Sequence, residues 1–299
     1  MKRSTVICAL RTSAGMILLL FLALPLQAFA GESTNLDAIN GLLQSSSLSK
    51  PEQAEVRTRA ADAVNNGIPG DDVEIIVSRA VKRGADAGTI NGFIDTVLSA
   101  KKAGLPTGPV LDRIEQGLSK GVPPGRIDAA SRQLAEKLAI AQPLVDELIR
   151  NGVKPRGKAE RVDAIEATAR ALEKSLSADD IRGMGASVQN RKGTMPLFTS
   201  AVNTSAYFAG SGMSAKTATR IVRDAVASGY SERDLDGMVR RTAEEMRRGK
   251  SAEDAGLGME RGNMGGRGME QDMGGGRGMG SGSGSGSGSG MGSMGGRRK

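Results

Sequence analysis

Apolar residues recur along residues 51–256 at the spacing of an α-helix, and short polar turns interrupt them at regular intervals. One run has apolar side chains at i, i+3, i+4, i+7 and i+8, and it consists of Val73, Ile76, Val77, Ala80 and Val81. A second run with the same spacing consists of Ile90, Phe93, Ile94, Val97 and Leu98. This spacing predicts helices that each bury one apolar stripe against a neighbour. The sequence lacks the alternating runs typical of strands, so it predicts an all-α fold.

Glycines between these runs follow one another at steps of 17 and 20 residues. They are Gly67, Gly84, Gly104 and Gly121, and near the other end Gly212, Gly229 and Gly249. The two steps add up to 37 residues, the length of one helix-turn-helix unit. Many helices end with a residue at positive φ, which glycine adopts without a clash, and proline or an oxygen-bearing side chain often begins the next helix. We therefore expect each of these glycines to end a helix.

Alignment of the chain with itself predicts an α-solenoid-like array of about five 37-residue helical hairpins. Laying the segment from Gly212 on the segment from Gly67 pairs Val77 with Val222, and a shift of 37 residues pairs Val77 with Ile114. The expected hairpins start near residues 67, 104, 141, 175 and 212. The third hairpin is three residues short.

The third and fourth units follow the repeat less closely than the others. Ala141-Gln142-Pro143 stands where the first unit has Gly67-Ile68-Pro69, and in the fourth unit Ser175 takes the place of the glycine. Gly152, Pro155 and Pro196 indicate irregular loops in this part of the chain.

Residues 1–30 have the features of a secretory signal peptide. A basic start is followed by an apolar core of 11 residues from Met16 to Leu26, and Ala28-Phe29-Ala30 forms a cleavage site before Gly31. This core is short for a membrane-spanning helix, which needs about 20 residues. We expect cleavage after Ala30 and export to the periplasm or beyond. Residues 31–50 then form an N-terminal linker with one short helix from Asn35 to Leu43, and a long helix begins at Lys50-Pro51.

Residues 257–299 differ in kind from the array, because they consist mainly of glycine, serine, methionine and arginine. Such a composition cannot bury a core, so we expect a disordered tail. The folded repeat domain is accordingly placed at residues 51–256.

The formal net charge of +8 is spread unevenly over these parts. The predicted signal carries three cations and the tail carries six cations against three anions, which leaves about +2 for the array. This near balance argues against a specific nucleic-acid interface on the folded part. The sequence has no histidine, and its single cysteine, Cys8, lies in the predicted signal. Thiol catalysis, histidine acid–base catalysis and Cys/His metal sites are therefore excluded for the mature chain.

Acidic pairs and charged helix faces are candidate sites that also have structural explanations. Asp71-Asp72 and Asp179-Asp180 could hold a metal or act as acid–base pairs, but each falls in the first turn of a predicted helix, where the dipole favours anions. The charged faces between Arg240 and Arg248 could dock a partner, or form solvated pairs along the helix. We assign no catalytic, cofactor-binding or metal-binding residue from the sequence.

The tail offers two further hypotheses. Thioethers suit Cu(I), and the tail carries Met259, Met264, Met269, Met273, Met279, Met291 and Met294. Its Arg-Gly pairs begin at Arg261, Arg267 and Arg277. Because no aromatic residue interleaves these pairs, weak attraction to anionic envelope surfaces is favoured over binding of single-stranded nucleic acid.

The stretch GLPTGPVLDRIEQGLSKGVPPGRIDAA, residues 104–130, resembles repeats in uncharacterised exported bacterial proteins. The period also resembles that of tetratricopeptide and pentatricopeptide arrays, but the tetratricopeptide consensus is not matched. The resemblance spans roughly residues 50–255 and implies a helical-hairpin fold, and no binding residues carry over from it.

These observations favour an exported, non-enzymatic interaction or scaffolding module of the cell envelope that binds a protein partner through its array. The alternative is an envelope protein that binds Cu(I) through its methionine-rich tail. An enzyme would need a site built from Asp, Glu, Lys and Arg alone, such as paired carboxylates acting on a glycan, and no such pair can be placed across a cleft.

Overall fold

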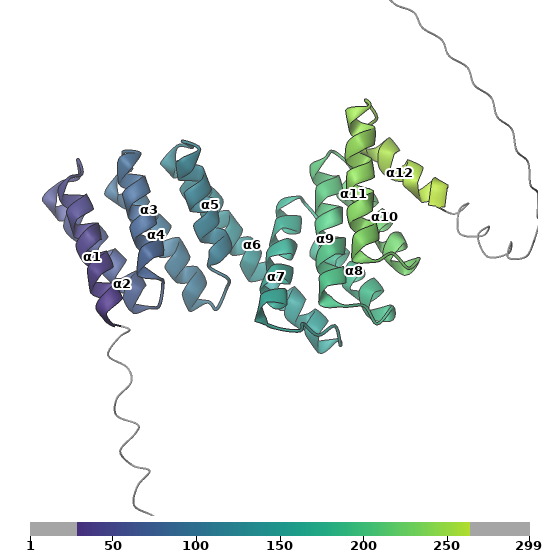
Figure 1. The fold of residues 1–299 in the computed structure, drawn as a ribbon, viewed down its shortest axis with the longest axis horizontal. Helices are drawn as coiled ribbons and strands as arrows, with labels where there is room; N and C mark the ends of the chain where they lie inside the picture. Colours follow the sequence, from purple (N-terminus) through teal and green to yellow (C-terminus); the bar gives the residue numbers. More distant parts are fainter. Residues whose placement is uncertain (1–28, 264–299) are drawn as a thin grey trace, which may run out of the picture. The chain divides into compact units, whose positions relative to one another are not determined.

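The computed structural model describes residues 29–263, which form twelve α-helices and contain no strand (Figure 1). The helices are α1 (Phe29–Gln44), α2 (Lys50–Asn65), α3 (Gly70–Lys82), α4 (Ala87–Lys102), α5 (Gly108–Ser119), α6 (Pro124–Arg150), α7 (Lys158–Glu173), α8 (Ala178–Asn190), α9 (Met195–Gly210), α10 (Ala215–Ala227), α11 (Glu232–Arg247) and α12 (Ala252–Asn263). The all-α fold predicted from the sequence is confirmed. Almost all of the expected signal peptide, and the tail after residue 263, lie outside the described residues.

Every turn from α2 to α12 uses the same helix-ending hydrogen bonds. At the end of α4, Gly104 has a φ of +70°, and the N–H of Leu105 donates to the carbonyl of Ala100 over 2.9 Å. A side chain at this φ would be strained, whereas glycine is not. All seven glycines expected to end helices have positive φ, and Gly152 adds an eighth.

The fourth unit makes the same turns without glycine. Ser175 and Lys192 adopt φ values of +66° and +53°, so they occupy the positions that glycine holds elsewhere. The following helices begin with oxygen-bearing caps, because Ser177 caps α8 and Thr194 caps α9 through their side chains.

The apolar stripes face the interior as the sequence predicts. In α4, Ile90, Phe93, Ile94, Val97 and Leu98 are all buried. In α3, the side chains of Val73, Ile76, Val77 and Ala80 are buried, while Val81 is only partly covered.

The helices stack in two rows, as expected for a solenoid-like array. In one row α1 packs on α3 and α3 on α5, and in the other row α2 packs on α4 and α4 on α6. The pattern continues beyond α6, where α7 packs on α9, α9 on α11, and α8 on α10. A hairpin consists of two consecutive helices, one from each row, such as α3 and α4.

The expected start of a third hairpin near residue 141 is wrong. Helix α6 runs without a turn from Pro124 to Arg150 and contains Pro143. Its first half is the second helix of the second hairpin, and its second half takes the place of the first helix of the third hairpin, with α7 as its partner. Ala141 is fully buried within α6 and does not adopt positive φ, so the position that would need glycine remains helical.

Both ends of the array extend beyond the expected limits. Helix α1 is longer than the short helix expected in the linker, and it buries Ile39 and Leu43 against the neighbouring helices. Helix α12 continues past residue 256 to Asn263, and Ala252 and Ala255 are buried. The part of α1 that carries Ile39 and Leu43 therefore belongs to the packed array.

Helix α6 joins the two parts of the array. Within residues 29–263, no helix from α1 to α5 packs extensively on a helix from α7 to α12. Both groups pack on α6 instead (Figure 1). A direct link across this point is the ion pair between Arg113 of α5 and Glu173 of α7, whose atoms lie 3.0 Å apart.

Candidate functional site

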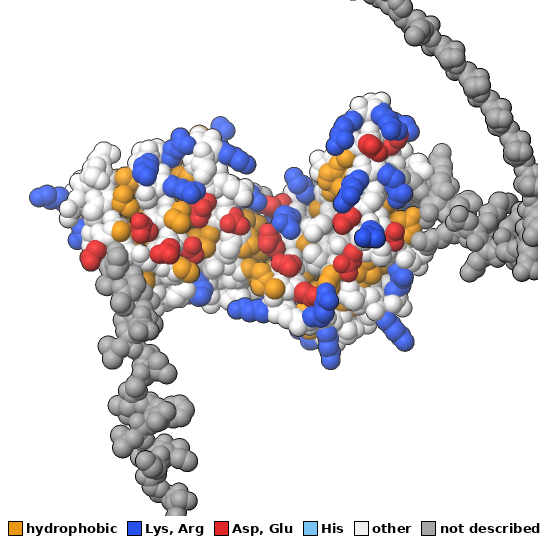
Figure 2. All heavy atoms as spheres, in the orientation of Figure 1, with side chains coloured by type: hydrophobic (Ala, Val, Ile, Leu, Met, Phe, Trp, Pro, Cys, Tyr) orange, Lys and Arg blue, Asp and Glu red, His pale blue; other side chains and the backbone are white. Residues whose placement is uncertain are grey.

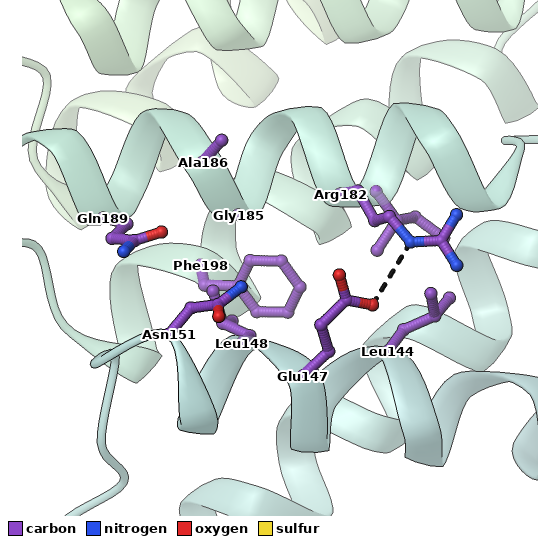
Figure 3. A pocket seen from close by; sticks show the side chains of 10 residues that line it. Leu144, Glu147, Leu148, Asn151, Arg182, Gly185, Ala186, Gln189 and Phe198 are labelled. Carbon is purple, nitrogen blue, oxygen red and sulfur yellow. Dashed lines mark hydrogen bonds and ion pairs between the residues drawn. The ribbon is translucent and has the colours of Figure 1, made fainter.

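A groove lies between α6 and α8 and is closed at its base by α9. Its volume is about 210 Å³. Apolar side chains form its floor, and these are Leu144, Leu148, Ile181 and Phe198. Figure 3 shows Phe198 behind the groove, between the helix that carries Leu148 and the helix that carries Gly185.

The repeat is altered at one core position beside the groove. Val77, Ile114 and Val222 occupy equivalent positions in three other units, and all three side chains are fully buried. The fourth unit has Gly185 at this position. A Cβ atom there would lie 3.1 Å from Cδ1 of Leu148, so the glycine lets α8 approach α6 closely.

A second alteration leaves the end of the groove open. In the first unit Arg83 donates from Nε to the carbonyl of Leu118 at 2.9 Å, and in the fourth unit Arg191 donates to the carbonyl of Val226 at 2.7 Å. The equivalent residue beside the groove is Asn151, which is shorter than arginine. Asn151 and Gln189 lie at this end of the groove, and their side chains make no hydrogen bond to the described residues (Figure 3).

An ion-pair network lines the opposite end. Glu147 of α6 and Arg182 of α8 are joined over 3.2 Å, and Arg182 also contacts Asp179 at 2.8 Å. These hydrogen bonds, with Glu147 first, raise the pKa of Arg182 above its ordinary range. The groove thus has an apolar floor, a charged pair at one end and two carboxamides at the other.

Three other hollows are more polar or more open. One lies where α5, α6 and α7 meet and is lined by Asp112, Arg113, Gln116, Glu166 and Arg170 among others. Another lies between α9 and α11, and a third covers the ends of α3 and α5. Some of their charged groups are paired with neighbours, as in the 2.8 Å pair between Arg170 and Glu166.

The acidic pairs lie where the sequence predicts. Asp71-Asp72 and Asp179-Asp180 occupy the first turns of α3 and α8. Asp180 completes a capping box with Ser177, and Asp71 accepts a hydrogen bond from Asn35. These contacts support a helix-terminal role. Burial first, and the charges of Asp71 and Asp112 next, raise the pKa of Asp72.

The charged side chains between Arg240 and Arg248 are distributed over the surface of α11 and its C-terminal end. Arg248 pairs with Glu245 at 2.9 Å, and Glu245 also contacts Lys250. These pairs match the interpretation of a solvated helix end. Figure 2 shows that, on the visible face, lysine and arginine side chains project mainly at the periphery.

The sequence interpretation named no residue of the groove as a site. Its signal was present in the repeat, because Gly185 is the small residue in a column of Val77, Ile114 and Val222. The difference at Gly185 becomes visible only when the fourth unit is aligned with the others. That alignment is hard to find because Ser175 stands where other units have glycine. The depth of the groove also depends on Phe198, which comes from another helix.

Comparison of the chain with protein-family models, with curated proteins and with solved structures finds no match. No helix in residues 29–263 is both long enough and apolar enough to span a membrane. In the same residues, no three Asp or Glu side chains come together in an arrangement that could hold a metal ion.

Proposed function

We propose that the mature protein is an exported, non-enzymatic interaction module of the cell envelope, and that the groove between α6 and α8 binds a peptide segment of a protein partner. The observation that carries this proposal is the combination of an apolar floor with two carboxamides that have no partner among the described residues. Each carboxamide offers one donor group and one acceptor, which is the hydrogen-bonding pattern of a peptide bond.

The size of the groove supports a peptide over a small metabolite. Pockets for small molecules usually measure about 300–1,000 Å³. A groove of about 210 Å³ suits one side chain of a longer segment that continues along the surface. Repeat arrays commonly bind partners in this way, because stacked helices form extended surfaces.

The groove also gives little support to catalysis. Its acidic and basic groups, Glu147 and Arg182, are bound to each other, so neither is held ready for proton transfer. Export remains an inference from residues 1–30 of the sequence.

An in-cell cross-linking pull-down tests the function. The mature chain, a form ending at Asn263 and the variant Ala186→Gln are compared, with captured proteins identified by mass spectrometry. Ala186 lines the groove, and equivalent positions carry the large side chains Glu115 and Arg223, so glutamine fits the fold. We expect one recurrent partner with the first two forms and its loss with Ala186→Gln. Capture that persists with Ala186→Gln would contradict a role for the groove.

Cu(I) binding by the tail is the second candidate, and the methionine spacing favours it. Met264, Met269, Met273 and Met279 recur at steps of 5, 4 and 6 residues, a spacing that could bring three thioethers to one ion. All four lie outside the described residues. Titration of the mature chain with Cu(I) against a chromogenic chelator should show binding that disappears in the form ending at Asn263. Equal binding by both forms would contradict a tail site.

A further inference from the structure

Two basic turns flank the carboxamide end of the groove. The turn from α6 to α7 follows Asn151 directly, and the turn from α8 to α9 begins two residues after Gln189. Four exposed cations in and beside these turns make no hydrogen bond or ion pair with the described residues through their side chains: Arg150, Lys154, Lys158 and Lys192.

The nearby charged groups leave these cations uncompensated. Glu160 accepts hydrogen bonds from the backbone N–H of Arg156 at 2.8 Å and from its Nε at 2.6 Å, and these bonds, the backbone one first, lower the pKa of Glu160. Glu147 is bound to Arg182 at the other end of the groove. Arg191 points to the carbonyl of Val226 and neutralises no carboxylate. Glu232 of α11 also lies beside the second turn, where it accepts a hydrogen bond from Thr194 over 3.3 Å. The cations of the two turns still outnumber these carboxylates, so a ligand that meets the turns encounters net positive charge next to an apolar floor.

Other turns of the array differ from these two. The equivalent turn between α10 and α11 carries Ser228 followed by Glu232 and Asp234, so it is not basic. The turn between α5 and α6 carries Lys120, but the core position in that unit is filled by Ile114. The hollow at the ends of α3 and α5 also has cations, but Arg79 is paired with Glu115 and Arg83 donates to the carbonyl of Leu118.

We propose that the groove and its two basic turns bind an acidic peptide segment of the partner. One aliphatic side chain of this segment enters the groove between Leu148 and Ile181. Carboxylates that follow in the peptide face Lys154 and Lys192. This inference rests on the proposed function, because it specifies the chemistry of the peptide that the groove receives.

The dimensions fit a short extended segment. From Leu144 to Asn151 helix α6 rises about 10 Å, at about 1.5 Å per residue. An extended peptide covers that distance in about three residues. The aliphatic anchor is therefore followed by one or two residues whose main chain passes Asn151 and Gln189, and the acidic residues come next. Charge complementarity of this kind favours rapid association and selects against basic segments.

A binding experiment with a defined probe tests the inference. The fluorescein-labelled peptide Gly-Leu-Gly-Glu-Asp-Glu is titrated with the mature chain, and fluorescence anisotropy gives Kd. Lys154→Glu and Ala186→Gln should each weaken binding about tenfold. Lys120→Glu, the matched control in a unit without the groove, should change Kd less than about twofold. A probe with glycine in place of leucine measures any attraction between carboxylates and cations elsewhere, including those of the tail.

Two results would overturn the inference. One is an equal loss of affinity in Lys120→Glu and Lys154→Glu, and the other is unchanged affinity for the probe without leucine, since either shows unspecific attraction. The pull-down separates this failure from failure of the function. If the groove-dependent partner is still captured while the probe does not bind, the acidic chemistry is wrong and the interaction module stands. If Ala186→Gln also leaves capture unchanged, the proposed function fails with it.

Discussion

Positive φ after a helix is the backbone requirement that sets the period of this array. Glycine meets it at eight positions, and Ser175 and Lys192 meet it with a side chain present. The left-handed conformation costs a residue with a Cβ atom roughly 1–2 kcal/mol. Sequence reasoning could predict these turns wherever glycine marks them, whereas Ser175 required alignment with other units.

Exchanges at these positions should change stability in opposite directions. Ser175→Gly should raise the free energy of unfolding by about 0.5–1 kcal/mol, because the strain removed at a φ of +66° outweighs the extra freedom that glycine gives the unfolded chain. Gly104→Val should lower it by about 1 kcal/mol or more, since valine would be strained at a φ of +70°. Urea denaturation followed by circular dichroism measures both. A loss of stability in Ser175→Gly would contradict the assignment of strain.

Asp72 should make stability depend on pH. Its pKa is raised in the folded protein above the ordinary value of 3.8, so the unfolded state holds its carboxylate more readily than the folded state does. The carboxylate therefore destabilises the fold above the raised pKa, and this penalty disappears as the pH falls below 3.8. Asp72→Asn should be more stable than the parent at pH 7, with the difference shrinking toward pH 3.5. A stability difference between Asp72→Asn and the parent that grows as the pH falls would contradict a raised pKa of Asp72.

Helix α6 shows where an element could not be predicted from its local sequence. The repeat places a turn at Ala141, but the buried positions of α6 continue through it at steps of four and three residues: Ile127, Ser131, Leu134, Leu138, Ala141, Val145 and Leu148. This unbroken stripe is the signal that favours one long helix. The alignment of Pro143 with Pro69 nevertheless led to the prediction of a turn there. Alanine at position 141 lacks the conformational freedom that such a turn needs. Most other helices carried both signals, whereas the turns before α8 and α9 lack a glycine at positive φ and α12 extends into the segment assigned to the tail.

Proline inside α6 should reduce its stability. Pro143 has no N–H to donate to the carbonyl of Ala139, and proline is about 3 kcal/mol less favourable than alanine within a helix. Pro143→Ala should raise the free energy of unfolding by about 1–2 kcal/mol, because the more flexible unfolded chain offsets part of the gain. Chemical denaturation checks this value. Destabilisation by more than about 0.5 kcal/mol would contradict this account, and it would mean that the restriction proline places on the unfolded chain outweighs its cost in the helix.

In the whole molecule, α6 is the element on which both parts of the array depend. The long-range packing of α4 and α5 on one side and of α7 and α8 on the other side meets on this helix. A repeat array is usually held together by contacts between neighbouring units, so damage at an end remains local. A destabilising substitution in α6 should instead loosen the packing of the helices on both sides of it.

Hydrogen exchange with mass spectrometry can compare a central lesion with a terminal one. Leu138→Asp places an unpaired charge at a fully buried position of α6, and it should speed amide exchange in α4 and α5 as well as in α7 to α9. Leu235→Asp, also at a fully buried position, should affect mainly α9 to α12. Effects of Leu138→Asp confined to one side of α6 would contradict its bridging role.

The central claim is that the groove between α6 and α8 is the surface that receives a protein partner, and site-specific photo-cross-linking in the cell tests it most directly. A photoreactive amino acid is placed at Gln189 in the groove, and in a control chain at Gln133, which is exposed on α6 roughly 16 Å before Leu144 along the helix. The account predicts one discrete cross-linked partner from position 189, none from position 133, and loss of the product when Ala186→Gln is added. Equal cross-linking from both positions, or a product unaffected by Ala186→Gln, would contradict it.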